Sequence, residues 1–357
     1  MASVHPRLGI RTGSLVIQLK QIAVSQYYIR IQHVKCSQNQ RRQVSNQRNK
    51  IPIKMKTPMI THQPAIIIEP VFILAGQSNM AGRCDAAELP AHLFLQQQQG
   101  NNDDDPVVEF RMCWDLDRNF GEGCSSQGQF LPLQPQPSPG LNMDIFGPEM
   151  ALAQSISPRL VDAGVKRAHL IKFALGSTNL HTHWNPTNSV TDGKLSDIGY
   201  YPQFLKFCKD SMELLQHNDD DKAAPSSSAS IVSRPLSGMF WLQGESDSSK
   251  AKTANAYLSN FKNFIQRVRQ DLGTPDLPLV VSPVIWNGKK VHVVNEALRQ
   301  AAKEVQHCYC IEALNQDEFG VQGSDAGVCA RHLTAAGLCE IGSRMGRAVP
   351  LEWLDRC

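Results

Sequence analysis

Short apolar runs alternate along the chain with longer stretches whose apolar residues recur every three or four positions. From Pro70 onward, five short runs have the length and composition of strands: Val71–Ala75, Ala168–Ala174, Gly238–Leu242, Leu279–Ile285 and Cys308–Ile311. These runs are apolar almost throughout, which is typical of strands that are covered on both faces. The pattern therefore predicts a parallel sheet buried between helices.

The stretches between these runs have the spacing of amphipathic helices. They are Pro148–Ser155, Gln203–Leu215, Ala254–Leu272, Val293–Val305 and Thr334–Val349. Their apolar stripes are interpreted as faces turned toward a core. The alternation of strand and helix predicts an α/β fold, a three-layer α/β/α sandwich with a central parallel sheet of about five strands.

Three polar segments predict surface loops. Gln96–Asp105 is low in complexity, Pro132–Pro139 contains four prolines, and Asn218–Ser230 combines an Asp run with Ser and Ala. We interpret each segment as solvated surface, including the Asp run, because adjacent carboxylates repel one another.

Ten cysteines are scattered along the chain without a CxxC pair. In a chain of 357 residues this pattern favours buried thiols and gives no structural zinc site. A bridge between Cys113 and Cys124 is left open.

The first 66 residues differ in charge from the rest of the chain. Eleven Lys and Arg and no acidic residue precede Glu69, which leaves 36 − 11 = 25 basic and 33 acidic residues, a net charge of −8. We predict a basic, disordered leader at 1–66 and one globular domain at 67–357. The leader is a transit peptide, an unstructured extension, or the result of a start at Met55 or Met59. The expected location is intracellular: the cytoplasm, or a plastid or mitochondrion if the leader is a transit peptide.

The same charge pattern raises the question of nucleic-acid binding. The basic residues of the leader are dispersed among Ser, Gln and Asn and form no RNA-binding motif, so no nucleic-acid partner is expected. No apolar run reaches the roughly 20 residues that a membrane-spanning helix needs.

The segment Gly76-Gln-Ser78-Asn-Met-Ala-Gly82 stands where the first predicted strand ends. It predicts a strand-to-helix turn that presents Ser78 at the carboxyl edge of the sheet, where open α/β folds bind ligands. A serine that only caps a helix gives the same pattern. The Gly-x-Ser-x-Gly elbow of α/β-hydrolases is not matched, so the segment alone is weak evidence for a nucleophile.

Three other segments place polar groups near the same edge. Gly176 follows a predicted strand and can bring a backbone amide close to a substrate. Gln243 and Glu245 follow another strand and offer an amide donor and a carboxylate, although a simple turn is the alternative. His332 precedes a predicted helix, and imidazole titrates near neutrality, which suits proton transfer. A capping or surface histidine is the alternative for His332.

His181 and His183 are spaced two residues apart, which raises the question of a metal site. Neither a third histidine nor a carboxylate stands nearby in the sequence, so no metal is expected.

Together these segments resemble the SGNH-hydrolase superfamily, and more narrowly the plant carbohydrate esterases that carry a sialate O-acetylesterase-like domain. The matching segments occur in the family's order: Gly76-Gln-Ser-Asn-Met-Ala-Gly-Arg83, Phe146-Gly-Pro-Glu-Met150, Gln243-Gly-Glu-Ser-Asp247 and His332-Leu-Thr-Ala-Ala-Gly337. The resemblance covers about residues 69–350. It implies a serine esterase that removes small acyl groups, with acetyl expected, from a carbohydrate or related alcohol without a cofactor.

The resemblance also implies roles for individual residues. Ser78 would be the nucleophile, and His332 would act first as general base and then as general acid. The backbone amides of Ser78 and Gly176 and the side chain of Gln243 would bind the oxyanion.

One position departs from the family pattern. Family members usually carry Asp three residues before the histidine, and this chain has Cys329 there. Three explanations stay open: Glu245 supplies the carboxylate, Asp325 does, or the protein is a weakened or non-catalytic relative that binds glycans or a partner. We favour Glu245. A general lipase is disfavoured because no apolar lid-like segment is evident.

Overall fold

The structure is a computed structural model that describes residues 66–95, 107–116, 124–188, 199–220, 231–286, 288–315 and 332–353. The predictions for residues 1–65, for the loop Gln96–Asp105, and for Asp325 and Cys329 fall outside these residues.

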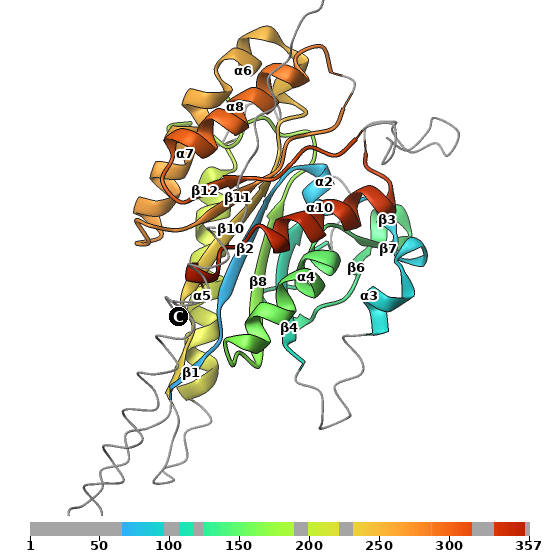
Figure 1. The fold of residues 1–357 in the computed structure, drawn as a ribbon, viewed down its shortest axis with the longest axis vertical. Helices are drawn as coiled ribbons and strands as arrows, with labels where there is room; N and C mark the ends of the chain where they lie inside the picture. Colours follow the sequence, from blue (N-terminus) through green and yellow to red (C-terminus); the bar gives the residue numbers. More distant parts are fainter. Residues whose placement is uncertain are drawn as a thin grey trace, which may run out of the picture. The chain divides into compact units, whose positions relative to one another are not determined.

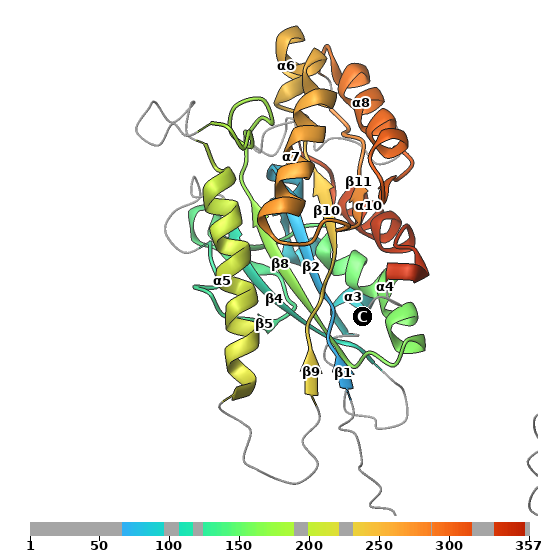
Figure 2. The same ribbon diagram turned by 90° about the vertical axis from the view of Figure 1, so that its left-hand side faces the viewer.

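A seven-stranded sheet forms the centre of the described domain (Figures 1 and 2). Its strands, in spatial order, are β12 (Cys308–Cys310), β11 (Leu279–Val281), β10 (Leu236–Leu242), β2 (Val71–Gly76), β8 (Arg167–Ala174), β4 (Glu109–Leu116) and β5 (Leu131–Pro132). Neighbouring strands are parallel except for the last pair, β4 and β5. The predicted α/β fold and its mostly parallel sheet are confirmed, with two more strands than expected.

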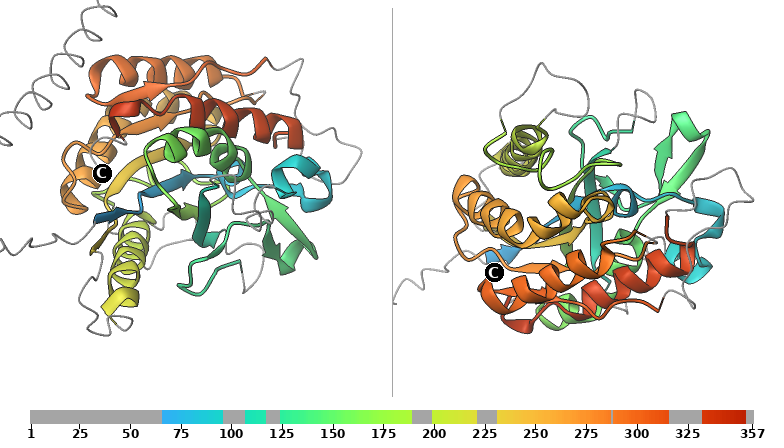
Figure 3. Two further views of the ribbon diagram at one scale, coloured as in Figure 1. Left: turned by 60° about the horizontal axis from the view of Figure 1, so that its bottom comes forward. Right: turned by 90° about the horizontal axis from the view of Figure 1, so that it is seen from above.

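Helices cover both faces of this sheet, which gives three layers (Figure 3). One face packs against α4 (Glu149–Asp162) and α10 (Ala335–Arg347). The other packs against α5 (Tyr201–Asp220), α6 (Ala251–Asn255), α7 (Tyr257–Asp271) and α8 (Val291–Glu304). The single helix predicted over Ala254–Leu272 is therefore two, which meet at Ala256. Among the described helices, none combines the length and apolarity required to cross a membrane.

Consecutive residues of β2 enter different cores. Phe72 and Leu74 pack toward α4 and α10, whereas Val71 and Ile73 pack toward α5, α7 and α8. All four side chains are fully buried. Because side chains alternate across a strand, a sheet covered on both faces requires apolar residues at every position, as the sequence has here.

Two sequence predictions need correction. The segment Pro132–Pro139 is not a continuous loop: it contains the end of β5 and all of β6 (Gln136–Ser138), which pairs with β7 (Met143–Phe146). β7 also pairs with β3 (Cys84–Asp85), so these three strands make a small antiparallel sheet. Proline lacks the amide hydrogen that a central strand needs, and these short edge strands tolerate it. The predicted loop Asn218–Ser230 also begins too early, because α5 continues to Asp220.

The bridge left open between Cys113 and Cys124 does not form, since both thiols are free and buried. The Cys113 sulfur instead accepts a hydrogen bond of 3.3 Å from Ser126 Oγ.

The order of connections makes β2 the central strand of the site region. The chain leaves β8 through α5 and returns as β10 on the other side of β2. The carboxyl ends of the three strands coincide, because Gly76 is in register with Ala174 on one side and Leu242 on the other. In open α/β sheets, ligands bind just beyond the carboxyl ends of the strands, at the place where the chain's connections change direction along the sheet.

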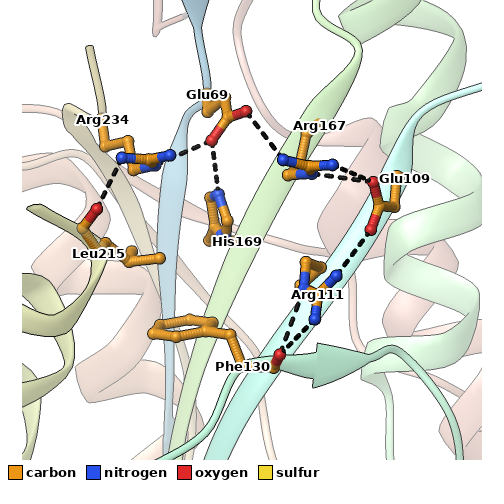
Figure 4. A network of polar contacts seen from close by, with 8 residues as sticks. All are labelled: Glu69, Glu109, Arg111, Phe130, Arg167, His169, Leu215 and Arg234. Carbon is orange, nitrogen blue, oxygen red and sulfur yellow. Dashed lines mark hydrogen bonds and ion pairs between the residues drawn. The ribbon is translucent and has the colours of Figure 1, made fainter. Parts of the chain in front are cut away.

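The opposite edge of the sheet carries a network of ionic contacts (Figure 4). Glu69, just before β2, accepts from Arg234 Nε at 2.8 Å and from Arg167 Nη1 at 3.4 Å, and it lies 2.9 Å from His169 Nε2. Arg167 also pairs with Glu109, so the network joins the amino ends of β2, β8 and β4. Burial alone raises the pKa of Glu69, but the hydrogen bond from His169 and the charge of Arg234 outweigh it and bring the pKa down to about 2.

Candidate active site

The turn after β2 is a strand-to-helix turn, as predicted. β2 ends at Gly76, and the four-residue helix α2 (Ser78–Ala81) begins at Ser78. The helix cap is Gln77, which makes no side-chain capping bond, so the interpretation of Ser78 as only a cap is wrong. Glycine is required at Gly76, because a Cβ atom there would overlap the carbonyl oxygen of Leu242.

Asn79, the residue after Ser78, joins three segments that are far apart in the sequence. Its Nδ2 donates to Glu245 Oε1 at 2.6 Å, and its Oδ1 accepts from the backbone amide of Leu333 at 3.1 Å. The carbonyl of Leu333 in turn accepts from Cys84 Sγ at 3.4 Å. The backbone that follows His332 is therefore fixed beside the Ser78 turn and the Glu245 carboxylate.

Glu245 is an almost completely buried carboxylate, with 5% of its surface exposed. Within the part of the chain that the structure describes, its Oε2 atom is buried and has no hydrogen-bond partner. Burial raises the pKa of Glu245, and the nearby charge of Asp247 adds to this, while the hydrogen bond from Asn79 works in the opposite direction. Buried carboxylates with raised pKa values are typical of functional sites.

Gln243, two residues before Glu245, is fully buried. Its Nε2 atom lies 2.7 Å from Asp247 Oδ2, 3.0 Å from the carbonyl of Thr178 and 3.2 Å from Gln77 Oε1. A side-chain amide has two hydrogens, so these three acceptors already occupy it. The assignment of Gln243 as an oxyanion donor stays a prediction, and it requires one of these hydrogens to turn toward the substrate.

Asp247 is a residue to which the sequence analysis gave no role. It is fully buried, and besides Gln243 it accepts from the backbone amides of Leu180 at 2.8 Å and His181 at 3.3 Å. Burial raises the pKa of Asp247 to about 6 against the effect of these hydrogen bonds. The only sequence signal was its place at the end of the Gln-Gly-Glu-Ser-Asp segment.

Through Asp247, the loop that follows Gly176 is tied to the end of β10. Gly176 is buried, and the next residue, Ser177, has a φ of 60°. This left-handed conformation costs a non-glycine residue about 1–3 kcal/mol and persists only where its surroundings enforce it. The hydrogen bonds from the amides of Leu180 and His181 to Asp247, three and four residues further on, supply such a constraint.

The two histidines of this loop have contacts within the protein. His183 Nδ1 accepts from the amide of Asn179 at 2.9 Å, and His181 Nδ1 lies 3.1 Å from Asn260 Nδ2. Over the described ranges of the chain, no group of three or more His, Cys, Asp or Glu side chains is placed to hold a metal ion.

The carboxyl edge of the sheet thus gathers a hydroxyl group, a buried carboxylate and a histidine-bearing segment from separate parts of the chain. These are the groups that nucleophilic acyl transfer requires: a nucleophile, a base and a group that orients the base.

Comparison with known proteins indicates an ester hydrolase. A family model described as "Carbohydrate esterase, sialic acid-specific acetylesterase" matches residues 69–350. The probable carbohydrate esterase At4g34215 of Arabidopsis thaliana is 24% identical over 256 residues, which are 68% of this chain and 78% of that protein. The solved structure of NanS has a TM-score of 0.50 at 14% identity, covering 82% of this chain and 98% of that one. The NanS likeness bears on the fold alone.

Proposed function

Because the chain belongs to the family of carbohydrate esterases and sialic acid-specific acetylesterases, which makes it a carboxylic-ester hydrolase for carbohydrate acyl groups, we propose that it removes acetyl groups through an acyl-enzyme on Ser78. The observation that carries this proposal is the Asn79 side chain. It ties the Ser78 turn both to Glu245 and to the backbone next to His332.

In the proposed mechanism, Ser78 Oγ attacks the ester carbonyl while His332 takes its proton. His332 then returns this proton to the oxygen of the departing sugar alcohol, which leaves the acetyl group on Ser78. Water, activated by the same histidine, releases acetate and restores the Ser78 hydroxyl. Since the nucleophile and the proton acceptor both come from the protein, the cycle closes without a cofactor.

The developing negative charge needs hydrogen-bond donors at the oxyanion position. We assign this function to the backbone amides of Ser78 and Gly176 and to the Gln243 side chain. Each such donor typically contributes on the order of 3 kcal/mol to lowering the barrier. The fixed loop after Gly176 supports the assignment of the Gly176 amide, because a preorganised donor costs no rearrangement during the reaction. The Gln243 side chain would have to exchange one of its present acceptors for the oxyanion.

We propose Glu245 as the carboxylate that orients His332. Its burial beside the Ser78 turn, and its Oε2 atom with no hydrogen bond among the described residues, support this role. Cys329 stands at the position where family members usually carry Asp, and a thiol cannot replace a carboxylate next to an imidazolium. A buried carboxylate from another segment, here Glu245, is therefore the simplest replacement for the usual Asp.

The test uses the purified chain with p-nitrophenyl acetate and acetylated sugars as substrates. We expect hydrolysis by the wild type, loss of activity in Ser78→Ala, and a fluorophosphonate label that maps to Ser78. A wild-type rate no greater than that of Ser78→Ala would contradict the proposal.

Cys329 favours one alternative function, a relative that binds acetylated glycans without turning them over. In that case the wild type and Ser78→Ala would bind the same acetylated sugar with equal affinity, and neither would release acetate.

A further inference from the structure

Lys172 on β8 and Glu149 at the start of α4 form an ion pair that is completely closed off from solvent. Lys172 Nζ lies 2.7 Å from Glu149 Oε2, and both side chains are 0% exposed. Burial lowers the pKa of Lys172, and the charge of Glu149 opposes this effect. Glu149 belongs to the segment Phe146–Met150, to which the proposed chemistry gives no role.

Every hydrogen of the lysine ammonium has its own acceptor. Besides Glu149, Lys172 donates to Gln136 Oε1 and to the carbonyl of Ala81, each at 2.9 Å. The other oxygen of Glu149 accepts from the amide of Gly147 at 2.8 Å and from Gln136 Nε2 at 3.1 Å. The cluster of Lys172, Glu149 and Gln136 is thus a saturated polar network, in which each contact constrains the others.

The contact with Ala81 links this network to the proposed nucleophile. Ala81 is the last residue of α2 and stands three positions after Ser78. A helix of four residues leaves its final carbonyls without partners inside the helix. The approach of the two segments is close: a Cβ atom at Gly147 would lie 2.8 Å from the carbonyl oxygen of Met80 and 3.2 Å from Lys172 Nζ.

Stability alone is a poor explanation for such a pair. Desolvating both charges is costly, and well-packed apolar residues in place of a buried ion pair are often neutral or stabilising. An apolar pair, however, cannot donate a hydrogen bond to the Ala81 carbonyl. We propose that Lys172 and Glu149 are positioning residues that hold the end of α2, and with it the Ser78 hydroxyl, in the reactive geometry. This inference rests on the proposed function, in which Ser78 is the nucleophile.

The experiment compares Lys172→Met and Glu149→Met with the double variant that carries both changes. Each single change leaves a buried charged group without its partner, so both should lower the Tm clearly. The double variant should recover part of that loss, because the charges are gone but the Ala81 carbonyl and the Gly147 amide still lack their partners. The kcat for p-nitrophenyl acetate should nevertheless stay about 10- to 100-fold below that of the wild type in the double variant, because small displacements of a reacting atom cost this much. The KM should change little, and labelling of Ser78 by a fluorophosphonate should slow in parallel.

Arg234→Met is the matched control, since it breaks a buried ion pair at the opposite edge of the sheet. It should lower the Tm and leave the kcat of the folded enzyme unchanged. A double variant with wild-type kcat and labelling rate would overturn the inference. So would a double variant that fails to fold, because the pair would then serve folding itself.

Hydrogen exchange tests the positioning role of Lys172 and Glu149 independently of the proposed esterase mechanism. In the double variant, the amides of Ala81 and Gly82, which bond to the carbonyls of Gln77 and Ser78, should exchange faster than in the wild type. This readout needs no turnover, so it decides the positioning role even if hydrolysis proves independent of Ser78. Unchanged exchange at these amides would overturn the inference.

Discussion

Two buried glutamates lie at opposite edges of the same sheet, and their surroundings differ sharply. Glu69 is held by Arg234, His169 and Arg167 at the amino ends of the strands (Figure 4). Glu245, at the carboxyl ends, has the neutral amide of Asn79 as its side-chain partner. The pKa of Glu69 falls to about 2, whereas the pKa of Glu245 is raised.

In the proposed mechanism, the two buried carboxylates have different uses. Glu69 has its charge compensated by cations, so its ionised form stabilises the fold. The negative charge of Glu245 has no cationic partner among the contacts described above to offset the cost of its burial. This favours interaction with a cation that forms only during a reaction, such as an imidazolium. We therefore expect the two residues to respond in opposite ways to the same substitution.

The largest expected effect is on catalysis at Glu245. In Glu245→Gln, kcat should fall about 10⁴-fold, as when the carboxylate of a serine triad is lost. The Tm should be unchanged or higher, because the amide removes a charge that burial disfavours. Steady-state hydrolysis of p-nitrophenyl acetate and thermal unfolding measure the two quantities. If Asp325→Asn shows the loss of kcat and Glu245→Gln does not, Asp325 is the orienting carboxylate.

The next largest effect is on stability at Glu69. Glu69→Gln removes the carboxylate that Arg234, Arg167 and His169 share. Loss of one partner of a largely buried ion pair typically costs about 3–5 kcal/mol, which is the loss of unfolding free energy expected at pH 7. The kcat of the folded variant should equal that of the wild type. Urea unfolding followed by fluorescence gives the first quantity, and a loss of kcat at constant stability would contradict the assignment.

The pH dependence sharpens this prediction. Because folding lowers the pKa of Glu69 from 4.5 to about 2, its ionisation stabilises the native state fully above pH 4.5. This advantage is lost as the pH falls through about 2. The difference in unfolding free energy between the wild type and Glu69→Gln should therefore shrink over this window.

The smallest expected effect is on the kcat of an Asp247 variant. Asp247 lies at the same edge of the sheet as Glu245. Asp247→Asn weakens the charge-assisted bonds to Leu180 and His181, so kcat should fall about tenfold, the equivalent of ~1.4 kcal/mol. Folding raises the pKa of Asp247 from 3.8 to about 6, so the wild type loses stability relative to the variant as the pH rises through this range. Unfolding at pH 4 and pH 7 tests the sign, and an equal difference at both pH values would contradict it.

Much of the fold follows from local patterns in the sequence. The strands β2, β8, β10, β11 and β12 were predicted because burial on both faces requires continuous apolar runs. β4 was missed, because Glu109, Arg111 and Asp115 interrupt its apolar residues where they reach partly exposed positions. Patterns of this kind report burial, and they fail where a strand is covered incompletely.

The sequence predicts at which edge of the sheet the site residues meet, but it does not predict the contacts between them. The ends of the predicted strands place Ser78, Gly176 and Glu245 at one edge of the sheet. The hydrogen bonds from the Gln243 amide to Asp247 and to the Thr178 carbonyl cannot be inferred from sequence spacing. Lys172 sits within an apolar run, and its partner Glu149 lies 23 residues earlier. Partnerships between buried polar groups depend on tertiary packing, so periodicity does not report them.

The hydrogen bond between Asn79 and Leu333 spans 254 positions of the chain, and this separation has a consequence for biosynthesis. All strands of the central sheet precede His332, so a chain emerging from the ribosome presents the Ser78 turn well before the proposed base is made. In the proposed mechanism, the nascent protein therefore stays inactive until α10 docks beside α4. Acquisition of activity would then report the docking of α10.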